Sequence, residues 1–156
     1  MEKFQREHVT FALIEELLPL FTLHNNTVAT HRDIPLSPNY DLYLAAEECG
    51  RLRAYVARCE KSNNALGYSI YFVGPHPQRK ESVQADETLL FIHPDSRGFG
   101  PRFIDWCDDQ LRADGVQLVR RNAKAKPDLN FSPMLERKGY ELEELVWTKR
   151  LDKEVA

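Results

Sequence analysis

The sequence contains few cysteines, and their arrangement excludes two classes of protein. Its 156 residues include only Cys49, Cys59 and Cys107. Their number is odd and their spacing does not match that of metal ligands, so we expect neither a disulfide framework nor a zinc site. Three reduced, structural cysteines are typical of a cytosolic protein.

No excess of one charge and no long hydrophobic run is present. The 21 basic and 24 acidic residues give a formal net charge of −3, and the basic residues are scattered, which argues against a nucleic-acid partner. No apolar run approaches the roughly 20 residues of a membrane-spanning helix. The amino terminus also lacks the apolar core of a secretory signal. We therefore expect a soluble, cytoplasmic protein without a membrane partner, formed by one domain over residues 1–156.

The most informative segment is a strand that runs through a glycine-bearing turn into a helix. Residues 88–92 form an apolar run of strand-forming residues, and Gly98 and Gly100 lie in the turn that follows. An apolar stripe with helical spacing comes next, at Phe99, Phe103, Trp106, Cys107 and Leu111. The first N–H groups of a helix have no partner within the helix and favour an anion. The segment predicts a phosphate cradle, although a tight turn without a ligand would have the same glycines.

Residues 93–102 resemble the pyrophosphate loop of the GNAT superfamily of acyl-CoA-dependent N-acetyltransferases. Arg97, Gly98 and Gly100 match the common form of that motif, and Arg102 replaces its last glycine. An arginine there adds positive charge near a pyrophosphate but alters one approach of the backbone.

A second block, residues 128–141, resembles the GNAT segment in which a short helix ends in a basic turn, a glycine and an aromatic residue. Leu135 occupies the usual position of the tyrosine that serves as general acid, and Asp128 that of an asparagine, with Asn130 two residues later. The segments 33–38 and 147–151, together with His24, resemble small acetyltransferases encoded by tailed bacteriophages.

The spacing of apolar residues predicts the order of elements. We expect helices over residues 8–23, 40–49 and 99–113, a polar loop over 74–80, and a short helix before Gly139. Strands are expected over 52–58, 66–73, 83–93, 116–122 and 140–151. The resemblance implies an α+β fold with a mixed, mostly antiparallel central sheet, flanked by helices, in which a splayed parallel strand pair binds acyl-CoA.

The resemblance also implies a binding site for acetyl-CoA as co-substrate, without a metal. The backbone of Leu90, Phe91 and Ile92 would pair with the pantetheine arm. The turn would hold the pyrophosphate through Arg97, Gly98, Phe99, Gly100, Pro101 and Arg102. Asn130 is assigned to the cofactor site on the same basis.

Acetyl transfer to an amine needs a group that accepts the ammonium proton and help for the leaving thiolate. Glu87 is the candidate base, although the usual carboxylate position aligns better with Thr88. Neighbouring strand residues face opposite sides of a sheet, so this offset matters unless a bulge corrects it. Ser132 is the candidate acid, with Tyr140 or solvent as alternatives. Glu87 can equally be a solvated charge at the end of the strand.

The leading hypothesis is an acetyl-CoA-dependent N-acetyltransferase that acts on a primary amine of a protein, peptide or small metabolite. The alternative is a catalytically weak or inactive GNAT-fold protein that binds a host or virion partner, which Thr88, Leu135 and Arg102 favour. A different acyl donor on the same scaffold is a third reading, because a fold does not determine a function. Many relatives pair through terminal strands, so a monomer and a homodimer both stay open, and a phage protein would act in the host cytoplasm.

Overall fold

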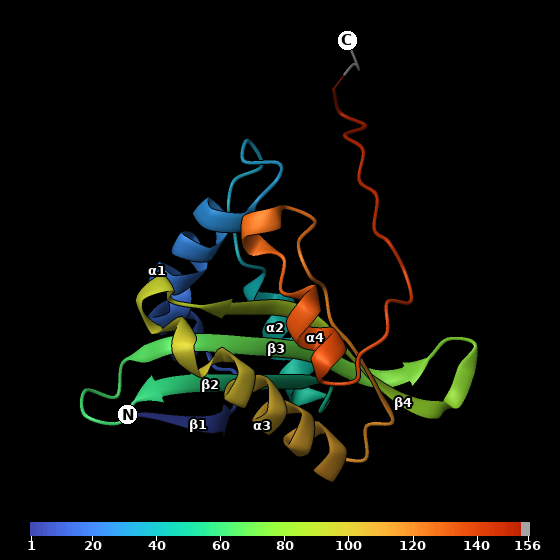
Figure 1. Cartoon of the computed structure of the whole chain (residues 1–156), viewed down its shortest axis with the longest axis horizontal. Helices are drawn as coiled ribbons and strands as arrows, with labels where there is room; N and C mark the ends of the chain where they lie inside the picture. The colour runs from blue at the N-terminus through green and yellow to red at the C-terminus, as the bar shows by residue number, and fades with distance from the viewer. Residues whose placement is uncertain (154–156) are drawn as a thin grey trace.

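The computed structural model of the chain describes residues 1–153, which form one five-stranded sheet with helices on both faces (Figure 1). The strands β1 (Glu2–Glu7), β2 (Leu52–Cys59), β3 (Ala65–His76), β4 (Arg79–Ile92) and β5 (Leu118–Arg120) lie in chain order across the sheet. Strands β1 to β4 are antiparallel neighbours, whereas β5 runs parallel to β4. The predicted mixed, mostly antiparallel sheet is therefore confirmed.

Four α-helices flank this sheet: α1 (Phe11–Val28), α2 (Tyr40–Glu48), α3 (Gly100–Ala113) and α4 (Ser132–Arg137). The first two begin at side chains that cap free N–H groups, since Thr10 accepts from the Leu13 amide and Asn39 accepts from the Leu42 amide. Two short 3₁₀ helices, η1 (Pro94–Phe99) and η2 (Pro127–Leu129), precede α3 and α4.

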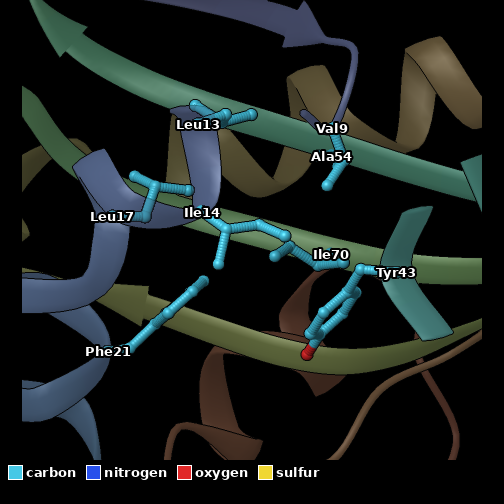
Figure 2. A pocket seen from close by; sticks show the side chains of 8 residues that line it. All are labelled: Val9, Leu13, Ile14, Leu17, Phe21, Tyr43, Ala54 and Ile70. Carbon is cyan, nitrogen blue, oxygen red and sulfur yellow. The ribbon is translucent and has the colours of Figure 1, made fainter. Parts of the chain in front are cut away.

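The apolar core has one layer on each face of the sheet. Helices α1 and α2 cover the first layer, where a small apolar pocket lies between the helices and strands β2 and β3 (Figure 2). The pocket is lined by seven core residues and by the partly buried Tyr43: Val9, Leu13, Ile14, Leu17, Phe21, Tyr43, Ala54 and Ile70. Helix α3 covers the second layer with Phe103, Cys107 and Leu111, against Tyr55 and Tyr71 of the sheet.

Four elements differ from the sequence prediction. The polar loop expected over residues 74–80 belongs to a long β3–β4 hairpin, and β1, whose central apolar residue is Phe4, was not predicted. The strand expected over 140–151 is absent: the chain after α4 is extended but has no strand partner (Figure 1). Strand pairing depends on contacts with a distant neighbouring strand, which a local sequence pattern does not report. Helix α1 also continues through Pro19 to Val28, beyond the expected end at residue 23.

Between residues 1 and 153, no helix combines the length and apolar character needed to cross a membrane. The same residues contain no cluster of three or more side chains arranged to hold a metal ion.

Candidate functional site

Strands β4 and β5 separate after three paired positions, and the gap between them forms the candidate site. Gln84, Ala85 and Asp86 pair with residues 118–120. After that point the Asn122 side-chain amide donates to the Glu87 carbonyl oxygen over 3.1 Å, where a backbone partner would otherwise lie. We call the gap between residues 88–92 and 121–125 the wedge. Both of its sides line one broad groove.

A β-bulge at Thr88 decides which way the side chains of β4 point. Tyr71 of β3 lies opposite Glu87, but the next β3 position, Ile70, lies opposite Leu89, so Thr88 is the extra residue. Glu87 consequently shares the α3 face of the sheet with Tyr71, whereas Leu89 and Phe91 pack on the α1 side. Thr88 itself is exposed at the start of the wedge.

The Glu87 carboxylate is buried and already has partners. Its side chain is 2% exposed and forms an ion pair with Arg121, whose own side chain is 0% exposed. The Ser69 hydroxyl donates to the Glu87 Oε2 over 3.0 Å. Burial raises the pKa of the Glu87 carboxyl, and the charge of Arg121 opposes that rise. The predicted base therefore lies at the bottom of the wedge, inside an ion pair.

Arg121 connects this ion pair to two further elements. Its guanidinium donates to the Asp108 Oδ1 of α3 over 2.6 Å and to the Tyr140 hydroxyl oxygen over 2.8 Å. The Tyr140 hydroxyl in turn donates to Asp108, and the guanidinium also lies 5.4 Å from the centre of the Tyr71 ring. These contacts hold β4, α3 and the segment after α4 together where the strands part. The sequence analysis did not identify Arg121 as a site residue. The only feature that could have indicated it is its positive charge within the strand expected over residues 116–122.

The predicted phosphate turn lies at the end of the wedge. It is not an open loop, because residues 94–99 form η1, which leads directly into α3. No side chain caps the start of α3 and its first turn has no acidic residue, so the helix dipole favours an anion there. The Gly100 N–H itself donates to the Arg97 carbonyl oxygen, and Pro101 has no N–H. Arg97, Gly100 and Pro101 line the groove.

The other predicted turn residues have different surroundings. Phe99 is buried between Phe4 and Phe103, so only its backbone remains for a ligand. Gly98 is exposed, with no atom within 4 Å of the place that a Cβ would take. The Arg102 side chain forms an ion pair with Glu2 of β1 and therefore points toward the edge of the sheet.

The remaining predicted site residues lie on the groove. Leu90, Phe91 and Ile92 form the β4 side of the wedge. Asn130 and Ser132 also line the groove, and the Ser132 amide donates to the Asn130 Oδ1 over 2.9 Å. The predicted residues therefore lie on one groove, and the role of each stays a prediction.

An aromatic cluster forms the α1 side of the groove, and it adds His24 and Tyr68, which were not predicted as site residues, to the predicted Phe91. The His24 ring of α1 stacks on Phe91, with 4.7 Å between ring centres and 10° between planes. The His24 Nδ1 lies 2.7 Å from the Tyr68 hydroxyl oxygen of β3. All three residues line the groove.

Solved structures of acetyltransferases share this fold. The chain is similar to a ribosomal-protein-alanine N-acetyltransferase from Brucella melitensis biovar Abortus 2308, with a TM-score of 0.67, 17% identity and coverage of 96% of this chain and 99% of that one. It is also similar to an aminoglycoside acetyltransferase from an uncultured soil metagenomic sample in complex with sisomicin (TM-score 0.70, 15% identity, 96% of each chain).

A third structure is a predicted acetyltransferase with acetyl-CoA from Clostridium acetobutylicum, with a TM-score of 0.65, 13% identity and coverage of 97% of each chain. No protein-family model and no curated protein sequence matches the chain. At these identities the likeness establishes the fold, which is the GNAT fold that the sequence resemblance implied.

Proposed function

We propose that the chain is an acetyl-CoA-dependent N-acetyltransferase that moves an acetyl group to a primary amine of a protein, peptide or small metabolite. The observation that carries the proposal is the parting of β4 and β5 beyond Asp86, which leaves the β4 backbone over residues 88–92 without a partner on that side in the described part of the chain. The acetyl-CoA of a neighbouring structure with this fold adds to that support.

The residues present fit an extended ligand that ends in a pyrophosphate. The N–H and C=O groups of Leu90 and Ile92 point into the wedge, because they alternate with those of Phe91, which face Tyr68 and Gly67 of β3. They suit the amides of a pantetheine arm, as an added strand would. The uncapped start of α3 at Gly100, together with the guanidinium of Arg97, suits a pyrophosphate. Acetyl-CoA would supply an activated thioester at the end of the pantetheine arm that lies away from the pyrophosphate.

The roles of Glu87 as base and Ser132 as acid stay predictions. The Glu87 carboxylate is engaged by Arg121 and Ser69, which favours a structural role at the bottom of the wedge over a free proton acceptor. Ser132 lies on the groove, so its hydroxyl stays a candidate acid. Water in this open groove is a further acceptor for the ammonium proton.

The same contacts of Glu87, together with the buried Leu135 at the tyrosine position of the family, favour a second candidate. This candidate is a GNAT-fold protein that binds acyl-CoA without transferring the acyl group efficiently, and whose function is to bind a host or virion partner. Turnover separates the two functions, since both retain binding of acyl-CoA.

The test is calorimetric binding of acetyl-CoA and CoA to the wild type and to Gly100→Trp. A Cβ at Gly100 would approach only the flexible end of the Ile92 side chain, at 3.3 Å, and the bulk of tryptophan fills the cradle. Ala113→Trp places the same bulk at the exposed far end of α3 and is the matched control. We expect binding by the wild type and Ala113→Trp but not by Gly100→Trp. A well-folded wild type without binding overturns the proposal.

We also propose that the protein acts in the cytoplasm, that of a host cell if it is phage-encoded, and that two copies pair. Support for pairing comes from the extended segment after α4, where Leu142, Val146 and Trp147 are exposed. No backbone hydrogen bond joins residues 141–153 to the rest of the described chain. Light scattering after size exclusion should give a dimer mass, and a monomer at all concentrations would contradict it.

A further inference from the structure

Beside Phe91, on the α1 side of the wedge, the structure holds a histidine whose protonation state can be deduced. Tyr68 is 0% exposed, so its hydroxyl hydrogen needs an acceptor inside the protein. Among the described residues the only partner of that hydroxyl is the His24 Nδ1, at 2.7 Å. The hydroxyl therefore donates to Nδ1, and the hydrogen of a neutral His24 imidazole lies on Nε2.

The surroundings of His24 keep this imidazole neutral. The His24 ring is stacked on the apolar ring of Phe91. Its hydrogen-bond partner Tyr68 is itself packed against the edge of Phe21. Burial, and then the positive charge of Lys124 across the wedge, lower the pKa of His24 to about 4. Lys124 is the charged group that acts on the His24 ring. Burial raises the pKa of the Tyr68 phenol well above its usual value, so the phenol stays protonated.

The His24 Nε2–H has no partner in the described chain, and it is not among the buried polar atoms that lack one. It is therefore open to the groove that His24 lines. Phe91, on which the ring stacks, belongs to the β4 segment along which the acyl arm is proposed to lie. A neutral, fixed N–H donor thus lies next to a residue of the segment along which that arm is proposed to lie.

We propose that the His24 Nε2–H donates a hydrogen bond to the carbonyl oxygen of the bound acyl thioester, and that Tyr68 is the positioning residue that holds His24 in this tautomer. This inference rests on the proposed function. The amine nitrogen forms a bond to the carbonyl carbon while the π electrons move to the oxygen. Collapse of that oxyanion breaks the C–S bond, the thiolate takes up a proton, and the ammonium proton passes to solvent. The hydrogen bond to His24 strengthens as the negative charge develops, and His24 transfers no proton.

A neutral donor suits this task better than an imidazolium. A permanent charge on the α1 side would repel a cationic amine before reaction, whereas an N–H group favours only the developing oxyanion. Neutral histidine acts as an electrophile in other enzymes in the same way.

Two measurements test the inference independently of each other. Nitrogen-15 NMR of the histidine side chains reports which His24 nitrogen carries the proton, and it needs no activity. We expect a protonated Nε2 and an unprotonated Nδ1 from pH 6 to 8, and a change of tautomer population in Tyr68→Phe. A protonated Nδ1 in the wild type overturns the inference.

Steady-state kinetics test the catalytic part. His24→Phe keeps the stacked ring without the donor and should lower kcat by about 100-fold, with little change in the Kd for acetyl-CoA. His24→Gln keeps an N–H donor and should stay within about 10-fold of the wild type. Unchanged kcat in His24→Phe overturns the inference, as does a loss in His24→Gln as large as that in His24→Phe, which indicates a base. If the wild type itself neither binds nor turns over acetyl-CoA, the proposed function fails, and the NMR result still describes His24.

Discussion

Arg121 and Glu87 form a buried ion pair at the point where β4 and β5 part, and neither side chain is more than 2% exposed. The pair is joined by Ser69 from β3 and by Asp108 from α3. The charges therefore lie at the base of the wedge, where they fix its opening instead of facing a substrate. A side chain in such a position is expected to affect stability first.

Arg121→Met should lower the free energy of unfolding by about 3–5 kcal/mol, because it leaves the buried Glu87 carboxylate without a cation. Glu87→Gln should lower it by less, because Arg121 keeps Asp108 as a partner. The double variant should lose much less than the sum. Chemical unfolding of the three variants measures this coupling. Arg120→Met is the control, since Arg120 pairs with Asp86 and Glu144 at an exposed position and should cost less than about 1 kcal/mol.

If Glu87→Gln is as stable as the wild type but inactive, the base role predicted from the sequence is favoured over the structural one. If it is unstable but retains kcat when folded, the structural role is favoured.

The sequence was sufficient to predict the elements with strong apolar periodicity. Helix α3 and the strand before η1 appear where the stripe and the apolar run predicted them. What it did not predict depends on contacts between distant residues. The bulge at Thr88 is a matter of pairing with β3, and the orientation of Glu87 follows from that bulge. The stacking of His24 on Phe91 joins residues 67 positions apart, and no local pattern encodes it.

Gly67 should be intolerant of any side chain. A Cβ there would lie 2.8 Å from the Phe91 carbonyl oxygen, a backbone atom that cannot move without displacing β4. We expect Gly67→Ala to lower the free energy of unfolding by about 1–3 kcal/mol. It should also weaken acetyl-CoA binding, because Phe91 is part of the wedge. Gly98→Ala, with open space around its Cβ, should be close to neutral in unfolding. Equal unfolding midpoints for the two variants would contradict this account.

Acid should destabilise the fold in part through His24. The unfolded chain binds a proton at His24 near pH 6.5, but the folded chain does so only near its pKa of about 4. Stability therefore falls as the pH drops from about 6.5 to about 4, by up to about 3 kcal/mol from this residue. The difference in unfolding free energy between the wild type and His24→Phe should change over that interval and be constant above pH 7. A difference that does not vary with pH would show that His24 is not held neutral.

The three cysteines should react with alkylating reagents in an order that their surroundings determine. Hydrogen bonding from Ser62 is the main cause that lowers the pKa of Cys59 to about 7, so about half of this thiol is ionised at neutral pH. Cys107 lies in the α3 core layer, where burial raises its pKa. Mass spectrometry after brief treatment with iodoacetamide at pH 7.5 should find Cys59 modified first and Cys107 modified only on unfolding.

Ser62→Ala removes that hydrogen bond and should slow alkylation of Cys59 by raising the pKa of its thiol toward the usual value. Cys49, which is exposed, is the internal reference within each sample because the substitution does not touch it. The ratio of Cys59 to Cys49 modification should therefore fall in Ser62→Ala, and fall less as the pH rises above 8. A ratio unchanged by the substitution would mean that Ser62 does not stabilise the Cys59 thiolate.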